Sequence, residues 1–189
     1  MVTSVVTLGN ITDLNVTGKN PGAFAADLGI ANEYIVTGLL IRLGFDVGVV
    51  QLTRTPFDLW VYAYVKPQGD RVSLRAQIKT VSMGGSVKFG AGTRSGADRE
   101  YKSDVKEYKY TTEHNDMIIG IDRTTFDLYL IPTFFTERWG KSKSIGTMSI
   151  LRNNWDILLN WNAEFLSKLG IKLDLDFHQD SLLDYMNDF

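Results

Sequence analysis

The chain has 189 residues, of which 44% are hydrophobic and 22% charged, a balance that is typical of globular domains and excludes intrinsic disorder. The formal net charge of -2 gives no general attraction to a polyanion, so any such argument must come from local charge. With no cysteine and only 2 histidines, the chain excludes disulfide frameworks, thiolate metal sites and histidine-dependent catalytic triads. We expect one domain over residues 1–189 and a cytoplasmic protein, because residues 1–17 resemble neither a signal peptide nor a membrane span.

The first predicted element is a helix over residues 20–43. Asn20 is a good helix cap, Pro21 suits the first helical turn, and Gly44 is the expected terminator. Apolar residues recur at steps of three and four, which predicts one buried stripe. Its expected members are Phe24, Leu28, Ala31, Ile35, Leu39 and Leu43.

Short runs rich in β-branched and aromatic residues follow and predict strands over 45–52, 58–65, 73–81 and 87–89. Residues 93–113 are polar and suggest a loop followed by a solvated helix. Residues 116–121 and 126–132 predict a hairpin, 140–144 a polar loop, 155–169 an amphipathic helix, and the tail from 181 a short acidic helix. This order indicates an α/β or α+β domain with a mixed central sheet flanked by helices.

Most of the candidate catalytic residues lie on one predicted strand. Period-2 alternation in residues 74–81 puts Arg75, Gln77 and Lys79 on one face. The preceding strand opens at Asp58, and a short connection would bring that aspartate near Gln77 and Lys79. These residues also have an ordinary structural interpretation, in which Asp58 lies at a turn and Gln77 and Lys79 lie on a solvent-facing strand.

An acid, an amide and a lysine at one place are the groups that metal-assisted phosphodiester hydrolysis needs. The Asp58 carboxylate, the Gln77 side-chain carbonyl and the backbone carbonyl of Ile78 offer hard oxygen ligands to a divalent cation. The Lys79 ammonium would orient the nucleophile. Glu33, on the first helix and away from its apolar stripe, is either a supporting metal ligand, through the ion or a water, or a plain exposed helix residue.

Over residues 20–132 the chain resembles the PD-(D/E)xK nuclease superfamily. The resemblance rests on Glu33 in a leading helix, Pro56-Phe57-Asp58 at the proline-aspartate motif, and Gln77-Ile78-Lys79 at the (D/E)-x-K motif. Phe57 is an extra residue, and Gln77 replaces an acid, which removes one negative charge and should weaken metal binding. This glutamine variant looks like that of an intron-encoded homing endonuclease branch.

The resemblance implies a restriction-endonuclease-like core and a Mg²⁺-dependent endonuclease acting on double-stranded DNA, with Mn²⁺ as a substitute. It also implies catalytic roles for Asp58, Gln77, Lys79 and Glu33. A homing endonuclease is the preferred subtype. A restriction enzyme, a Holliday-junction resolvase, a ribonuclease and a catalytically inactive DNA-binding protein of the same fold remain alternatives.

Charge is unevenly distributed along the chain. Residues 71–110 hold nine basic and four acidic residues, a local net of +5, beside the predicted site. The predicted DNA contacts are Arg75, Lys88, Arg94, Arg99 and Lys102, and the glycine-bounded segment 87–89 would suit a DNA groove. Residues 150–189 have a net of -4 and form a predicted helical extension that could join two chains, since a duplex has two strands and one domain offers one site.

Overall fold

The computed structural model describes residues 15–52, 55–82, 84–93, 106–175 and 179–187. Its main sheet has five strands in the order β1-β2-β3-β7-β8. Strands β3 and β7 are parallel and the other neighbours antiparallel, so the sheet is mixed. These strands are β1 (Val47–Val49), β2 (Leu59–Tyr64), β3 (Arg71–Thr80), β7 (Met117–Ile121) and β8 (Leu128–Pro132).

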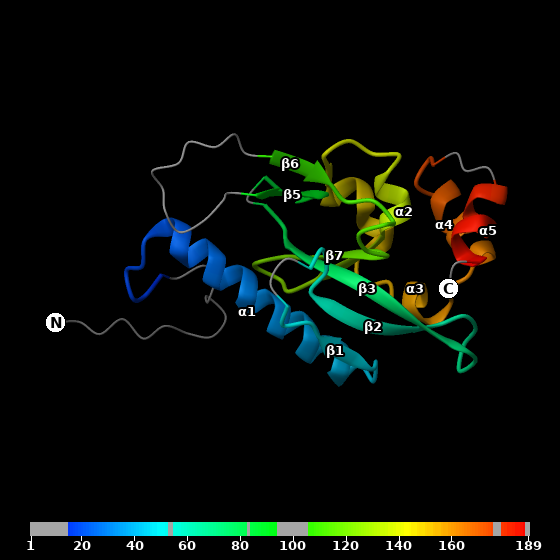
Figure 1. The fold of residues 1–189 in the computed structure, drawn as a ribbon, viewed down its shortest axis with the longest axis horizontal. Helices are drawn as coiled ribbons and strands as arrows, with labels where there is room; N and C mark the ends of the chain where they lie inside the picture. Colours follow the sequence, from blue (N-terminus) through cyan, green and yellow to red (C-terminus); the bar gives the residue numbers. More distant parts are fainter. Residues whose placement is uncertain (1–14, 53–54, 83, 94–105, 176–178, 188–189) are drawn as a thin grey trace.

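Within the described residues, two small antiparallel sheets and five α-helices accompany the main sheet. The small sheets pair β4 (Ser86–Lys88) with β9 (Ser142–Ser144) and β5 (Gly90–Thr93) with β6 (Lys106–Lys109). The helices are α1 (Pro21–Arg42), α2 (Thr133–Thr136), α3 (Asp156–Leu159), α4 (Ala163–Ile171) and α5 (Gln179–Asn187), with a 3-10 segment, η2 (Ile145–Leu151). In Figure 1, α1 runs along one side of the sheet, while α2, α4 and α5 gather near the opposite end. The mixed α+β fold expected from the sequence is confirmed.

Helix α1 begins as predicted, but it buries a different stripe. Asn20 caps it by accepting a hydrogen bond from Gly22 N. The predicted stripe is wrong in part. Ile35 and Leu39 pack against the core, but Leu43 and Ala31 are exposed, and Phe24 and Leu28 are only partly covered. The helix meets β3 and β1 through its second half, so burial follows the residues that face those strands. The buried residues are Asn32, Val36, Thr37 and Leu40.

By length and apolar composition, α1 is the one helix in the described part of the chain that would suit a membrane span. Its Val36 and Leu40 have no exposed surface, and Asn32 Nδ2 donates to Thr80 Oγ1 of β3 over 2.7 Å. Such burial and such a hydrogen bond to the sheet are also found in a helix that packs on the core of a globular protein.

The strands β2 and β3 form a hairpin whose register sets the site. Leu59 faces Ala76, Val61 faces Leu74, and Tyr64 faces Arg71. Leu59, Val61, Leu74 and Ala76 are fully buried on one face of this hairpin. The residues between them in sequence therefore point to the other face.

The hairpin of β7 and β8 is confirmed, and both of its strands are buried throughout. Gly120 of β7 leaves room for Val87 of β4, since a Cβ on Gly120 would lie 2.7 Å from Val87 Cγ2. Val87 and Phe89 are fully buried, so the prediction that segment 87–89 enters a DNA groove is wrong for these two side chains. They are apolar and cover the sheet instead.

Three other predicted segments differ from the structure. Residues 106–109 form strand β6 rather than a solvated helix, because they pair with β5. The loop over 140–144 includes β9, which pairs with β4. The single helix over 155–169 is two helices, because Trp161 N donates to Tyr64 O and Asn162 caps the second helix through Phe165 N.

The predicted short C-terminal helix is present as α5. Leu166 and Leu169 of α4 and Leu182 of α5 join the same hydrophobic core as the sheet residues. The ring of Tyr185 stacks on Phe134 of α2 with centroids 5.5 Å apart. The C-terminal helices are therefore packed on the body of the protein.

Candidate active site

Asp58 lies directly before β2, where the β2–β3 hairpin still pairs. Its backbone N–H donates to Ala76 O over 2.9 Å. Its carboxylate Oδ2 accepts from Ile78 N over 2.8 Å and from the Gln77 side-chain amide. The hairpin register thus brings the aspartate and the glutamine together, 19 residues apart in the chain.

Gln77 is 8% exposed, and its Nε2 lies between two oxygens. It donates to Asp58 Oδ2 and approaches Ile78 O at 3.3 Å. A carboxylate oxygen and a carbonyl oxygen therefore converge on one positively polarised group. Hard divalent cations prefer oxygen donors of the kind that Asp58 and Ile78 offer here, whereas Gln77 presents its Nε2 rather than its side-chain oxygen to this point. Among the described residues, no three Asp, Glu or His side chains gather into a metal-binding group.

Lys79 follows on the same face of β3, half-buried. Its Nζ donates to the hydroxyl of Tyr110 over 3.1 Å. Burial lowers the pKa of Lys79, against the attraction of the Asp58 and Glu33 carboxylates, which raises it. The ammonium and both acids thus act on one another electrostatically.

The pKa values of the two acids, Asp58 and Glu33, are shifted in the same direction. Burial raises the pKa of Asp58, although its hydrogen bonds from Ile78 and Gln77 and the charge of Lys79 oppose the rise. Burial also raises the pKa of Glu33, and the charge of Asp58 adds to this effect. Acids and a lysine whose pKa values are shifted by burial and by one another occur at functional sites, and they also occur in structural ion-pair networks.

Glu33 reaches this region because its neighbour anchors α1. Asn32 is 2% exposed, and its hydrogen bond to Thr80 fixes α1 against the end of β3. The next residue, Glu33, is half-buried and electrostatically coupled to both Asp58 and Lys79. Sequence reasoning missed Asn32, because apolar residues surround much of this helix and the sequence does not show which side faces the sheet.

A second residue that sequence reasoning missed holds the loop before Asp58. Asn115 has no exposed surface, donates through Nδ2 to Pro56 O over 3.2 Å, and accepts from Thr133 Oγ1 over 2.5 Å. It thereby ties the start of β7 to the segment that delivers Asp58. No spacing rule in the sequence links residues 56 and 115, which are distant in the chain.

The predicted DNA contacts differ in their exposure and in the partners that the structure gives them. Lys88 is exposed on β4. Arg75 instead pairs with Asp116 over 2.7 Å, and its guanidinium also donates to the carbonyls of Thr112 and Glu113. Because these partners occupy its guanidinium, Arg75 is not among the DNA contacts that we propose. Arg94, Arg99 and Lys102 lie outside the described residues.

The pair of Arg75 and Asp116 predicts a stability effect. The Asp116 side chain is 3% exposed and that of Arg75 29%. We expect Asp116→Ala to cost about 3 kcal/mol, because it leaves a partly buried guanidinium unpaired, and to lower Tm by about 6–12 °C in thermal unfolding. Asp46→Ala is the control, since its partner Arg71 is exposed and such pairs contribute less than about 1 kcal/mol. Equal losses in the two variants would contradict the structural role of Asp116.

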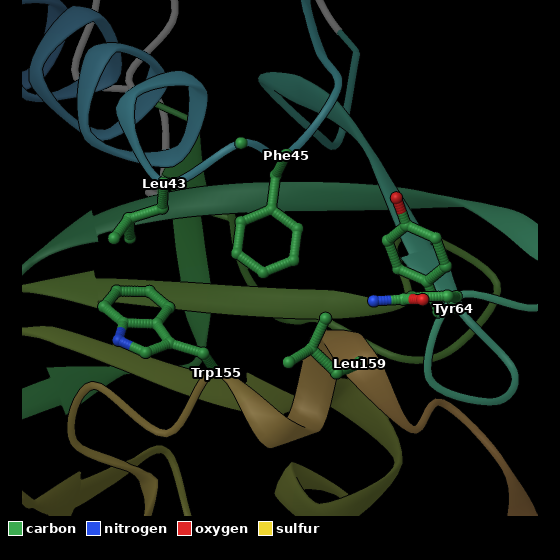
Figure 2. A pocket seen from close by; sticks show the side chains of 7 residues that line it. Leu43, Phe45, Tyr64, Trp155 and Leu159 are labelled. Atoms are coloured by element: carbon green, nitrogen blue, oxygen red, sulfur yellow. The ribbon is translucent and has the colours of Figure 1, made fainter.

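A cavity of about 240 Å³ lies elsewhere, between the end of α1, Tyr64 of β2 and α3. Figure 2 shows Leu43, Phe45, Trp155 and Leu159 around it. Tyr64 is at the opposite end of β2 from Asp58, and no Asp, Glu or Lys lines the cavity. This apolar cavity is therefore separate from the candidate active site.

The sequence matches no known family profile, and it matches no curated protein. Among solved structures, the fold is similar to that of a homing endonuclease. That structure is I-Ssp6803I, described as a bacterial homing endonuclease, and it aligns with a TM-score of 0.53 and 15% identity. The alignment covers 70% of this chain and 91% of that one, so the likeness in fold extends over most of both.

Proposed function

We propose that this protein is a metal-dependent endonuclease that hydrolyses phosphodiester bonds in double-stranded DNA, and that it is a homing endonuclease. The observation that carries the proposal is the meeting of Asp58, Gln77 and Lys79 at one end of the β2–β3 hairpin. The similarity in fold to a homing endonuclease supports it. The chemistry of the three side chains, rather than the fold, argues for hydrolysis.

Each residue has a proposed part in this reaction. Asp58, Gln77 and the carbonyl of Ile78 would hold Mg²⁺, with Glu33 in support, and the ion would supply an activated water and charge neutralisation. The Lys79 ammonium would orient the attacking water beside the scissile phosphate. Lys88 would hold the DNA backbone through its charge. The C-terminal helices would join two copies into a homodimer, because a double-strand break needs two sites.

Cleavage by this protein should depend on a divalent ion. We expect the purified protein to cut DNA of a substrate library with millimolar Mg²⁺ or Mn²⁺, and to lose at least ~10²-fold in rate with excess EDTA, since the attacking water would be activated by the bound ion. Restoring the metal should restore cutting. RNA of matched sequence is the control for substrate class. Cleavage that persists in EDTA would contradict the metal role, and a preference for RNA would replace DNA as the substrate.

A second candidate function is a DNA-binding protein that does not cut. Gln77 contributes no charge where an acid would, and no group of three acidic or histidine side chains gathers among the described residues. This candidate predicts DNA binding that is measurable by fluorescence anisotropy, with no cleavage by the parent protein under any metal condition.

A further inference from the structure

The side chain of Lys79 has one defined polar partner in the described part of the chain. Its Nζ donates to Tyr110 Oη over 3.1 Å and lies 4.9 Å from the centroid of the same ring. No described carboxylate is within ion-pairing distance of this ammonium, and Asp58 and Glu33 act on it at longer range. The tyrosine is therefore the group that fixes where the ammonium sits.

Tyr110 is itself rigidly placed by elements other than β3. It directly follows β6, is 2% exposed, and donates its backbone N–H to Phe89 O over 2.9 Å. Its ring meets those of Tyr108 and His114 edge-on, with centroids 5.5 and 6.2 Å away. His114 is held in turn by Thr111, whose hydroxyl lies 2.9 Å from Nδ1. The hydroxyl of Tyr110 is thus presented from a packed aromatic cluster.

A phenol suits this position better than a carboxylate would. Burial raises the pKa of Tyr110 above its ordinary value, so the hydroxyl is neutral at working pH. A neutral oxygen accepts a hydrogen bond from the ammonium without cancelling its charge. It also adds no negative charge beside an approaching phosphate. A lysine side chain otherwise populates many rotamers, so a fixed acceptor limits its disorder.

We propose that Tyr110 is a positioning residue, whose hydroxyl holds the Lys79 ammonium toward the site formed by Asp58 and Gln77. This proposal rests on the proposed nuclease function for its catalytic meaning. The contact itself belongs to the folded protein and can be tested apart from cleavage.

The kinetic test is Tyr110→Phe, which removes one oxygen and keeps the ring against Nζ. We expect the single-turnover cleavage rate to fall about tenfold or more, with the Kd for DNA changed less than about threefold and Tm within about 2 °C of the parent. Tyr62→Phe is the matched control. It is the same substitution on β2, where the ring is 42% exposed and lies beside Arg71 rather than Lys79, and it should keep the rate within about threefold. A parent-like rate for Tyr110→Phe would overturn the proposal, as would equal losses in both variants.

The second test does not need cleavage. In the metal-free protein labelled with ¹⁵N-lysine, the Nζ signal of Lys79 is identified by its loss in Lys79→Met. We expect Tyr110→Phe to shift that signal or to broaden it through faster hydrogen exchange, and Tyr62→Phe to leave it in place. An unchanged Nζ signal in Tyr110→Phe would overturn the proposed contact. If the signal moves but the parent cuts no nucleic acid, the contact stands and the nuclease function fails.

Discussion

An Asp58→Asn variant should lose at least ~10²-fold of the parent's cleavage rate while DNA binding stays within about threefold. The asparagine keeps an oxygen that can accept from Ile78 N and Gln77 Nε2, so the local hydrogen bonds have a substitute acceptor. What it removes is the one full negative charge among the proposed ligands on the hairpin. Metal binding, measured by calorimetry, should weaken in parallel with the rate.

The same variant should be more stable than the parent in the absence of metal. Burial raises the pKa of Asp58 above 3.8, so the folded state disfavours the ionised carboxyl. At pH 7 that penalty is present in full, and its removal should raise both the free energy of unfolding and Tm. As the pH falls through the raised pKa toward 3.8, the parent becomes protonated and the gain should disappear.

Asp46→Asn is the control for this stability effect, because the Asp46 side chain is 64% exposed and distant from the hairpin end that carries Asp58. It should not raise Tm. An Asp58→Asn protein that is less stable than the parent at pH 7 would show that the carboxylate is needed for folding rather than for chemistry. Undiminished cleavage by that variant would remove Asp58 from the proposed site.

Lys79→Ala should lower the cleavage rate by at least ~10²-fold, with the Kd for DNA little changed, because the proposed role of the ammonium is to orient the attacking water and not to hold the DNA backbone. Lys79→Arg should not restore the rate. A planar guanidinium cannot occupy the place of a compact ammonium under Tyr110 without moving its neighbours. Rates are measured in single turnover with saturating protein, so that binding and chemistry separate.

Lys88→Ala is the matched control, since it removes the same charge from an exposed position on β4. It should weaken DNA binding and reduce the slope of log Kd against log salt by about 0.9, while the rate at saturation stays near the parent's. If the two lysine variants lose binding and rate in the same proportions, Lys79 acts as a general phosphate contact, and its proposed catalytic role is wrong.

Local sequence signals predicted elements more reliably than the contacts between them. The cap at Asn20, the alternation around Gln77 and the apolar runs flanking residues 122–125 each depend on neighbours within a few positions. Helix α1 shows the limit of such signals. Apolar residues recur around much of its surface, so only the position of β3 decides that Asn32, Val36 and Leu40 are buried.

The candidate site likewise combines contacts that local sequence signals predict with contacts that only the fold creates. The register of one hairpin brings Asp58 to Gln77, and a short connection between two adjacent strands is readable in the sequence. Tyr110 and Asn115 come from segments 31 and 59 residues away from their partners Lys79 and Pro56. Residues 106–110 also looked like part of a solvated helix because of their charge, whereas pairing with β5 makes a strand and turns Tyr110 inward.

The sequence by itself determined the order of the main elements, the α+β class and the candidate trio of Asp58, Gln77 and Lys79, because these depend on period, turns and neighbours along the chain. Only the tertiary structure decided that Arg75 pairs with Asp116, that Val87 and Phe89 are buried, and that a phenol faces Lys79. Those outcomes depend on which distant segments share the interior, and burial and charge pairing between such segments leave no periodic signal in the chain.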